Sequence, residues 1–156
     1  MLVKNKNLFF IILTVFAVLL TIFIFNNSSK TGVESQESSD YFVDKIDRII
    51  FGFNVSIKPE TLSIIIRKSA HFLEYFLLSG LAFSALYLKT SNAAVSLLSI
   101  PYCLAVAITD EFYFQASASG RSPEWRDFFI DASGAVLAVV IIILIAKMAA
   151  KRRKGR

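Results

Sequence analysis

The sequence predicts an all-α protein with four membrane-spanning helices, and three observations support this fold class. The chain of 156 residues is 55% hydrophobic and only 19% charged, whereas soluble domains average nearer 45–50% and about 25%. Four apolar runs each approach the roughly 20 residues that an α-helix needs to cross a bilayer. The net charge of +5 comes from basic residues at the chain ends and beside these runs, which favours the lipid bilayer over a nucleic acid as partner.

The spans follow from the position of these runs. The first run carries no charge, and the few ionisable residues of the other three lie near one end of each. The predicted spans are residues 8–25, 69–88, 93–114 and 128–146, within a single domain of residues 1–156. We expect the first span to be a retained anchor, because the Asn- and Ser-rich residues 26–29 offer no small-residue cleavage site.

Two residues inside the third span carry separate expectations. Pro101 has no backbone N–H, so we expect it to kink the helix and free a carbonyl. Cys103 is the only cysteine, which excludes an internal disulfide and a Cys-based zinc site. We expect Cys103 to be a small packing residue.

The distribution of basic residues predicts the direction of the spans. Both tails and the short second loop carry basic residues without any acid: Lys4, Lys6, Lys89, Lys147, Lys151, Arg152, Arg153, Lys154 and Arg156. Lys and Arg accumulate on the cytoplasmic side of membrane proteins. We therefore expect both termini in the cytoplasm and the first and third loops outside.

The long first loop is expected to have two parts. Residues 26–40 are rich in Ser, Glu and Gln, which predicts an extended, flexible segment. Apolar residues then recur at helical spacing at Phe42, Ile46, Ile49, Ile50 and Phe53. This pattern predicts an amphipathic helix, either lying in the outer interface or packed on the bundle as a lid. Pro59 suits the first turn of a helix that continues into the second span.

Ionisable groups within the spans gather at one membrane face. Such groups cost several kcal/mol unless they are paired or hydrated, and here they occupy the outer ends of the second, third and fourth spans. We expect them to form one site in the outer leaflet. Its candidate ligand-binding residues are Arg67, His71, Glu74, Tyr75, Asp110, Glu111, Gln115, Arg121, Asp127 and Asp131.

Small residues and one tyrosine frame this cluster. The pairs Gly134/Ala138 and Gly80/Ser84 have the spacing that allows close helix packing. We expect the Tyr75 hydroxyl to donate to Glu74 or Asp131.

Several motifs of the chain resemble the VanZ-like family of bacterial integral membrane proteins. They are Lys-Ser-Ala-His-Phe-Leu-Glu-Tyr-Phe-Leu-Leu-Ser-Gly at 68–80, Asp-Glu-Phe-Tyr-Phe-Gln at 110–115, Gly-Arg at 120–121, Asp-Phe-Phe-Ile-Asp-Ala-Ser-Gly-Ala at 127–135, and Ser-Ser-Lys-Thr at 28–31. The similarity extends over about residues 8–146. It implies a small four-helix envelope protein of the bacterial cytoplasmic membrane. The founding member is associated with low-level teicoplanin resistance.

The residues leave three hypotheses open, of which the first is a binding module. Arg67, Lys68, Arg121 and Arg126 would hold the phosphate of an anionic phospholipid or of a lipid-linked wall precursor.

The second hypothesis is a hydrolase or transferase acting on a phosphate-bearing headgroup, with His71, Glu74, Asp110 and Glu111 as catalytic candidates. No Gly-x-Ser-x-Gly motif supports a serine nucleophile.

The enzyme hypothesis includes a hard divalent cation, Mg²⁺ or Ca²⁺, held by His71 and the carboxylates. One histidine with scattered carboxylates is a weak metal signal, so we predict no metal and no cofactor. The third hypothesis is structural: five acids and four basic residues nearly balance, as an internal ion-pair network requires. These residues are Glu74, Asp110, Glu111, Asp127 and Asp131, with Arg67, Lys68, Arg121 and Arg126.

Overall fold

A computed structural model describes residues 5–51 and 57–154 of the chain, and within them every regular element is a helix. The elements are α1 (Lys6–Ser28), α2 (Gly32–Phe51), α3 (Pro59–Thr90), α4 (Ala93–Ser96), α5 (Ser99–Thr109), the π-helix η1 (Asp110–Gln115) and α6 (Trp125–Lys154). Four segments are long and apolar enough to cross a membrane: α1, α3, the run from α4 to η1, and α6. The predicted fold class is confirmed.

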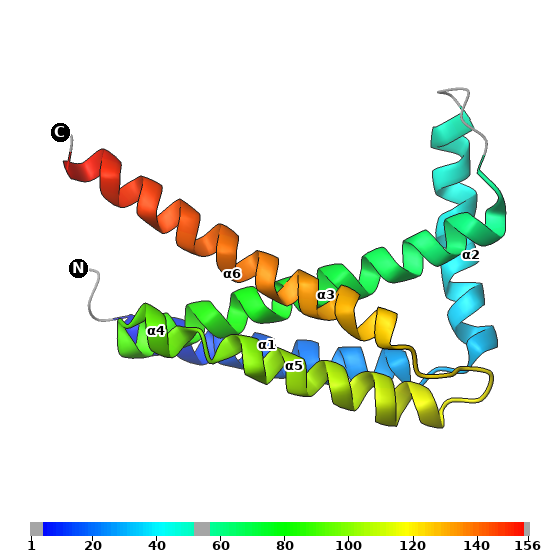
Figure 1. The fold of residues 1–156 in the computed structure, drawn as a ribbon, viewed down its shortest axis with the longest axis horizontal. Coiled ribbons are helices and arrows are strands. Elements are labelled where there is room, and N and C mark those ends of the chain that lie inside the picture. Colours follow the sequence, from blue (N-terminus) through cyan, green and yellow to red (C-terminus); the bar gives the residue numbers. More distant parts are fainter. Residues whose placement is uncertain (1–4, 52–56, 155–156) are drawn as a thin grey trace.

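The longest helix, α3, lies at the centre and packs against both α1 and α6. Small and aromatic side chains from the four spans fill the core, among them Ala17, Tyr75, Cys103 and Ala135. Cys103 is therefore the packing residue that we expected. Large apolar side chains face outward from the spans instead, as a lipid solvent allows. Both termini lie at one end of the bundle, and α2 with the loop before α6 lies at the other (Figure 1).

The third span is broken one turn before Pro101. The turn at Leu97 and Leu98 separates α4 from α5. Proline cannot donate to the Leu97 carbonyl four residues earlier. That carbonyl instead accepts from the backbone N–H of Ile100 at 3.0 Å. The expected irregularity is present, but the expectation of a freed carbonyl is wrong.

The expectation that residues 26–40 are extended is also wrong. Helix α1 continues to Ser28, and α2 begins at Gly32. A capping box starts α2: the Thr31 backbone N–H and hydroxyl donate to Glu34 Oε2 at 2.9 and 3.0 Å, and the Glu34 N–H donates to Thr31 Oγ1 at 3.3 Å. These bonds lower the pKa of the exposed Glu34 carboxyl. Composition alone obscured this local helix signal.

Helix α2 packs on the first half of α3. Gln36 Nε2 donates to Ser63 Oγ at 3.0 Å, and Val43 is buried on the same helix. In Figure 1, α2 runs across the direction of the spans. The structure thus has the packing of a lid, whereas a place in the membrane interface stays a prediction. The side chains of Ile49 and Ile50, and the whole of Phe53, lie outside the described residues.

Glycine brings α6 close to α3 at one of the two predicted positions. A Cβ added to Gly134 would lie 2.3 Å from the Phe72 carbonyl oxygen, so only glycine fits. A Cβ on Gly80 would meet only the Ile142 side chain at 3.9 Å, which is ordinary contact. Close packing is therefore confirmed at Gly134, and the same expectation for Gly80 is wrong.

Candidate functional site

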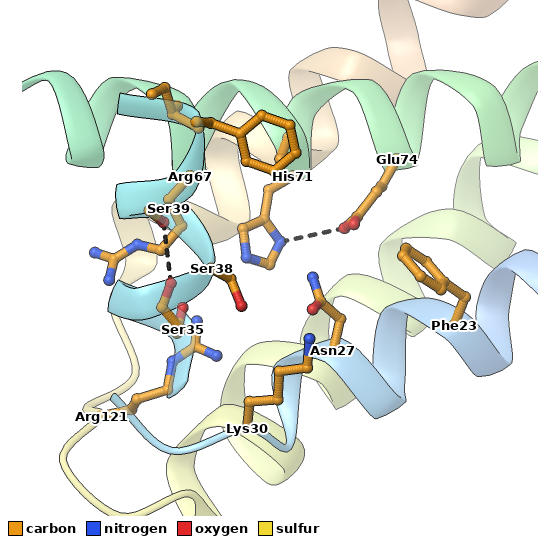
Figure 2. A pocket seen from close by; sticks show the side chains of 13 residues that line it. Phe23, Asn27, Lys30, Ser35, Ser38, Ser39, Arg67, His71, Glu74 and Arg121 are labelled. Carbon is orange, nitrogen blue, oxygen red and sulfur yellow. Dashed lines mark hydrogen bonds and ion pairs between the residues drawn. The ribbon is translucent and has the colours of Figure 1, made fainter. Parts of the chain in front are cut away.

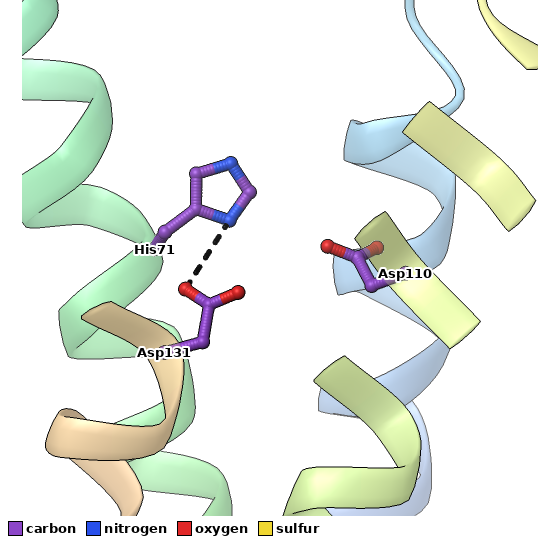
Figure 3. A group of neighbouring side chains, drawn as sticks. All are labelled: His71, Asp110 and Asp131. Carbon is purple, nitrogen blue, oxygen red and sulfur yellow. Dashed lines mark ion pairs between the residues drawn. The ribbon is translucent and has the colours of Figure 1, made fainter. Parts of the chain in front are cut away.

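Ionisable side chains from three separate spans meet in the bundle. His71 on α3, Asp110 on η1 and Asp131 on α6 each place a nitrogen or oxygen within 4.8 Å of the others, and all three residues are buried. Figure 3 shows the Asp110 carboxyl directed across the space between the helices toward His71 and Asp131. The predicted convergence of these residues is confirmed.

The π-helix places three polar side chains on one inward face. Its wider turn brings residues five positions apart, such as Asp110 and Gln115, closer to alignment than an α-helix does. Asp110, Glu111 and Gln115 are all buried. Gln115 Nε2 donates to Glu111 Oε2 at 2.5 Å and to Asp110 Oδ2 at 3.4 Å. Ser28 Oγ, from the end of α1, donates to the same Asp110 oxygen at 2.9 Å.

The loop after η1 folds back over this cluster. Gly120 adopts a left-handed conformation with φ of +77°, and the Gly32 N–H donates to the Ser119 carbonyl at 2.9 Å. Arg121 can then donate to the Ser28 carbonyl at 3.1 Å and to Gln115 Oε1. Burial lowers the pKa of the Arg121 guanidinium, which nevertheless stays protonated at neutral pH.

Glu111 supports the loop rather than facing a cavity. Its Oε1 accepts the backbone N–H of Glu124 at 2.6 Å, and its Oε2 accepts from Gln115. This carboxylate therefore fixes the start of α6 relative to η1.

The internal ion-pair network is not formed. Within the described residues, Lys and Arg make salt bridges to acids only in the pairs Lys68–Asp127 and Arg126–Glu124. Glu74, Asp110, Glu111 and Asp131 have no such partner there, so the structural hypothesis in its ion-pair form is wrong. Several buried atoms of the cluster also lack any hydrogen-bond partner: His71 Nδ1, Glu74 Oε2, Tyr75 Oη, Asp110 Oδ1, and Asp131 Oδ1 and Oδ2. The expected donation by Tyr75 is therefore absent.

Beside the cluster, a pocket of about 380 Å³ opens between the end of α1, α2, α3 and Arg121 (Figure 2). Three basic side chains line it, Lys30, Arg67 and Arg121, together with His71 and Glu74. The other lining residues are polar or apolar: Phe23, Asn27, Ser35, Ser38, Ser39, Phe42, Ile66 and Ala70.

The VanZ/LLP1 family model matches residues 10–146 of the chain. The chain belongs to the VanZ/LLP1 family. No curated protein and no solved structure matches it. Family membership and four spanning segments make it a multi-pass, VanZ-like membrane protein.

In this VanZ/LLP1 chain the predicted site residues lie in two pockets, in the buried cluster and in the core. Arg67, His71, Glu74 and Arg121 line the pocket in Figure 2. A second, polar pocket of about 290 Å³ is lined by Arg67 and Arg121 again, and by Gln115 and Asp127. Asp110 and Asp131 lie in the buried cluster with His71. Tyr75 is fully buried in the core.

Two predicted phosphate ligands do not reach the first pocket. Lys68 pairs with Asp127 instead. The Arg126 side chain is 83% exposed and lies beside Glu124. Of the four predicted phosphate ligands, Arg67 and Arg121 line the pocket and Lys68 and Arg126 lie outside it, and phosphate binding itself stays a prediction.

Two further parts of the pocket were not predicted from the sequence: one cation and the serine face of α2. Lys30 lines the pocket, as do Ser35, Ser38 and Ser39. With Phe42, these serines recur after three, four and seven residues, which is the spacing of one helix face. That signal was present in the segment predicted to be extended.

Proposed function

We propose that this VanZ-like protein binds a phosphate-bearing lipid headgroup, from an anionic phospholipid or a lipid-linked wall precursor, in the pocket between α1, α2 and α3. The observation that carries the proposal is the convergence of Lys30, Arg67 and Arg121 on one partly apolar pocket. Glu74 is the one acid among the lining residues.

The three cations are available to an external anion. In the described part of the chain, none of them forms a salt bridge with an acid. Arg121 donates only to neutral acceptors, the Ser28 carbonyl and the Gln115 amide oxygen. A guanidinium presents paired N–H donors that match two oxygens of a phosphate. A phosphate or pyrophosphate would therefore complete the charge balance of the pocket.

The remaining lining residues favour an amphiphile over a free anion. Phe23, Phe42 and Ile66 contribute apolar surface beside the polar groups. The volume of about 380 Å³ lies in the usual range for small-molecule sites. A lipid would place its headgroup among the cations and the first part of its chain against the aromatic residues.

Direct binding measurements test this proposal. Protein purified in a neutral detergent would be titrated with undecaprenyl pyrophosphate, phosphatidylglycerol and the uncharged control undecaprenol. We expect the first two to bind and undecaprenol not to bind. Arg121→Gln and Arg67→Gln should each weaken binding about 10- to 100-fold, as expected for a lost charged hydrogen bond.

Arg126→Gln is the matched control, because Arg126 is an exposed arginine outside the pocket. It should bind like the wild type. Equal binding of undecaprenol and its pyrophosphate, or equal losses for Arg121→Gln and Arg126→Gln, would contradict the proposal. The relative affinities of the two anionic probes distinguish a lipid-linked wall precursor from an ordinary phospholipid as the source of the phosphate.

We further propose that such binding at the outer face lowers susceptibility to teicoplanin, because it would alter access of the glycopeptide to its wall target. Expression in a susceptible bacterium should raise the inhibitory concentration. Arg121→Gln should abolish this effect at unchanged protein abundance, and Arg126→Gln should retain it. Unchanged susceptibility with the wild type would remove the resistance proposal but leave lipid binding to the titrations.

A second candidate is hydrolysis or transfer at the same headgroup. His71 Nδ1 lies 3.7 Å from Glu74 Oε2 and 3.9 Å from Asp131 Oδ1, and carboxylates beside a histidine can orient it for proton transfer. Release of phosphate from undecaprenyl pyrophosphate, lost in His71→Gln, would support catalysis. Binding without release would restrict the protein to the first function.

A further inference from the structure

We infer that His71, Asp110 and Asp131 form a binding site for one divalent transition-metal ion of the Zn²⁺ type. The three donors come from α3, η1 and α6, so the ion would join the three helices at the level of the buried cluster.

The cluster has the donor types of a metal site, at a spacing slightly wider than a bound ion requires. One donor atom from each residue lies within 4.8 Å of the other two. Zinc binds imidazole nitrogen and carboxylate oxygen at about 2.0–2.2 Å, so donors around one ion lie roughly 3–4 Å apart. A small rotation of each side chain would bring all three into range.

The unpartnered atoms of the cluster are the independent observation that points to a ligand. Asp131 is fully buried, and neither of its carboxyl oxygens has a hydrogen-bond partner. Asp110 Oδ1 and His71 Nδ1 are buried and unpartnered as well. Leaving such groups unsatisfied is costly. A single cation would satisfy the two carboxylates and the imidazole together.

Neighbouring residues hold the Asp110 carboxyl in place for this role. Its Oδ2 accepts from Ser28 Oγ at 2.9 Å and from Gln115 Nε2 at 3.4 Å. Its Oδ1 has no partner, and Figure 3 shows the carboxyl directed toward His71 and Asp131. Arg121 in turn donates to Gln115. Hydrogen bonds of this kind commonly orient the ligands of protein-bound metals.

The donor set selects the class of metal. Ca²⁺ requires six to eight oxygen ligands, and Mg²⁺ binds mainly carboxylates and water. One imidazole with two carboxylates suits Zn²⁺ better, and three protein ligands leave a coordination position for water or substrate. This inference replaces our sequence-based expectation that no metal binds.

The metal site does not depend on lipid binding. However, His71 belongs to the metal site and also lines the pocket of basic residues. A cation there would add positive charge to that pocket. Only this link rests on the proposed function. Metal binding itself is tested with Zn²⁺ alone.

The test is a calorimetric titration of purified, chelator-stripped protein in detergent with ZnCl₂. We expect one Zn²⁺ per chain. Asp110→Asn and Asp131→Asn should each weaken binding by about 100-fold or more, because outer-shell changes alone cost 10- to 100-fold. Glu124→Gln, a surface carboxylate outside the cluster, should bind like the wild type.

Thermal unfolding distinguishes a variant that no longer binds metal from a variant that no longer folds. Zn²⁺ should raise the melting temperature of the wild type and of Glu124→Gln but not of the two Asp→Asn variants. Without metal, Asp131→Asn should melt no earlier than the wild type, because the amide keeps the size of the carboxyl group and cannot place a charge in the buried cluster. If either variant fails to fold, the wild type is loaded with Co²⁺ and its ligand-field absorption spectrum is recorded. We expect a spectrum of protein-bound Co²⁺ that disappears when Zn²⁺ is added.

Three results would overturn the inference: no stoichiometric uptake of Zn²⁺ by the wild type, unchanged uptake by folded Asp110→Asn and Asp131→Asn, or a Co²⁺ spectrum of the free ion. Titration of undecaprenyl pyrophosphate with and without chelator then tests the link to the pocket. Zinc binding without lipid binding would remove the proposed function alone, and lipid binding without zinc uptake would remove the metal site alone.

Discussion

Arg121 and Arg126 are only five positions apart, but their side chains differ in burial and in hydrogen-bond partners. Arg121 is half-buried and donates to Ser28 and Gln115, whereas the Arg126 side chain is 83% exposed. The left-handed turn at Gly120 directs the first inward, and the start of α6 carries the second outward. Both were predicted as phosphate ligands from residue type and sequence position. Neither property reveals how the loop between η1 and α6 folds, so the two could not be told apart.

Glycine at position 134 gives a test at this scale. Gly134→Ala should destabilise the protein by about 1–3 kcal/mol, the usual cost of overpacking, because the added Cβ would lie 2.3 Å from the Phe72 carbonyl oxygen. The measurement is the free energy of reversible unfolding in mixed SDS micelles. Gly80→Ala is the control and should cause no loss, since alanine favours helix by up to about 1 kcal/mol. Equal losses at both positions would show that α3 and α6 do not approach closely at Gly134.

Among the elements that supply side chains to the pocket or the buried cluster, α2 and η1 were the least predictable. Hydrophobic periodicity predicted helix in the third span but could not distinguish a π-helix from an α-helix over residues 110–115. The side chains of η1 also have polar partners on other elements, such as Ser28 on α1, which no local pattern predicts. Helix α2 supplies Ser35, Ser38 and Phe42 to the pocket, so its packing on α3 decides whether the pocket exists.

Cross-linking tests this packing. Gln36→Cys with Ser63→Cys, in a Cys103→Ala background, should be joined in membranes by a short reagent that reacts with two thiols, because Gln36 Nε2 lies 3.0 Å from Ser63 Oγ. The shift in gel mobility of the cross-linked chain is the readout. Glu37→Cys with Ser63→Cys is the control, since Glu37 is exposed and points elsewhere on α2. Equal yields for both pairs would mean that α2 does not hold a defined position on α3.

At the scale of the whole molecule, the arrangement of charge relates the fold to the membrane. The termini lie at one end of the bundle, and α2 with the loop before α6 lies at the other (Figure 1). Basic residues at the terminal end predict that it faces the cytoplasm. The pocket of Lys30, Arg67 and Arg121 would then face outside the cell, where a wall precursor or outer-leaflet lipid can reach it.

Reporter fusions test this orientation. An exported phosphatase fused after Lys147 should be inactive, because it would remain in the cytoplasm, and the same enzyme fused after Ser122 should be active. Enzyme activity normalised to fusion abundance is the measurement. High activity after Lys147 would reverse the orientation and place the pocket at the inner face.

The sequence by itself determined the four spans, the helical class and the end of the bundle at which ionisable residues gather. Each of these features depends on local composition, because placing polar groups in lipid is costly. Local composition can be read from a single run of residues. It also indicated that His71, Asp110 and Asp131 lie close together, since all three lie near the same ends of their spans.

Only the tertiary structure decided which polar groups are paired and which are left without a partner. Of the carboxylates and cations counted as a balanced set, only Lys68 and Asp127 pair with each other among the described residues. The π-helix, the capped start of α2 and the turn at Gly120 send Arg121 to neutral acceptors and leave Asp131 without a hydrogen-bond donor. Pairing depends on distances of a few ångströms between helices. Those distances are set by helix packing, as at Gly134, and they cannot be predicted by counting charges along the chain.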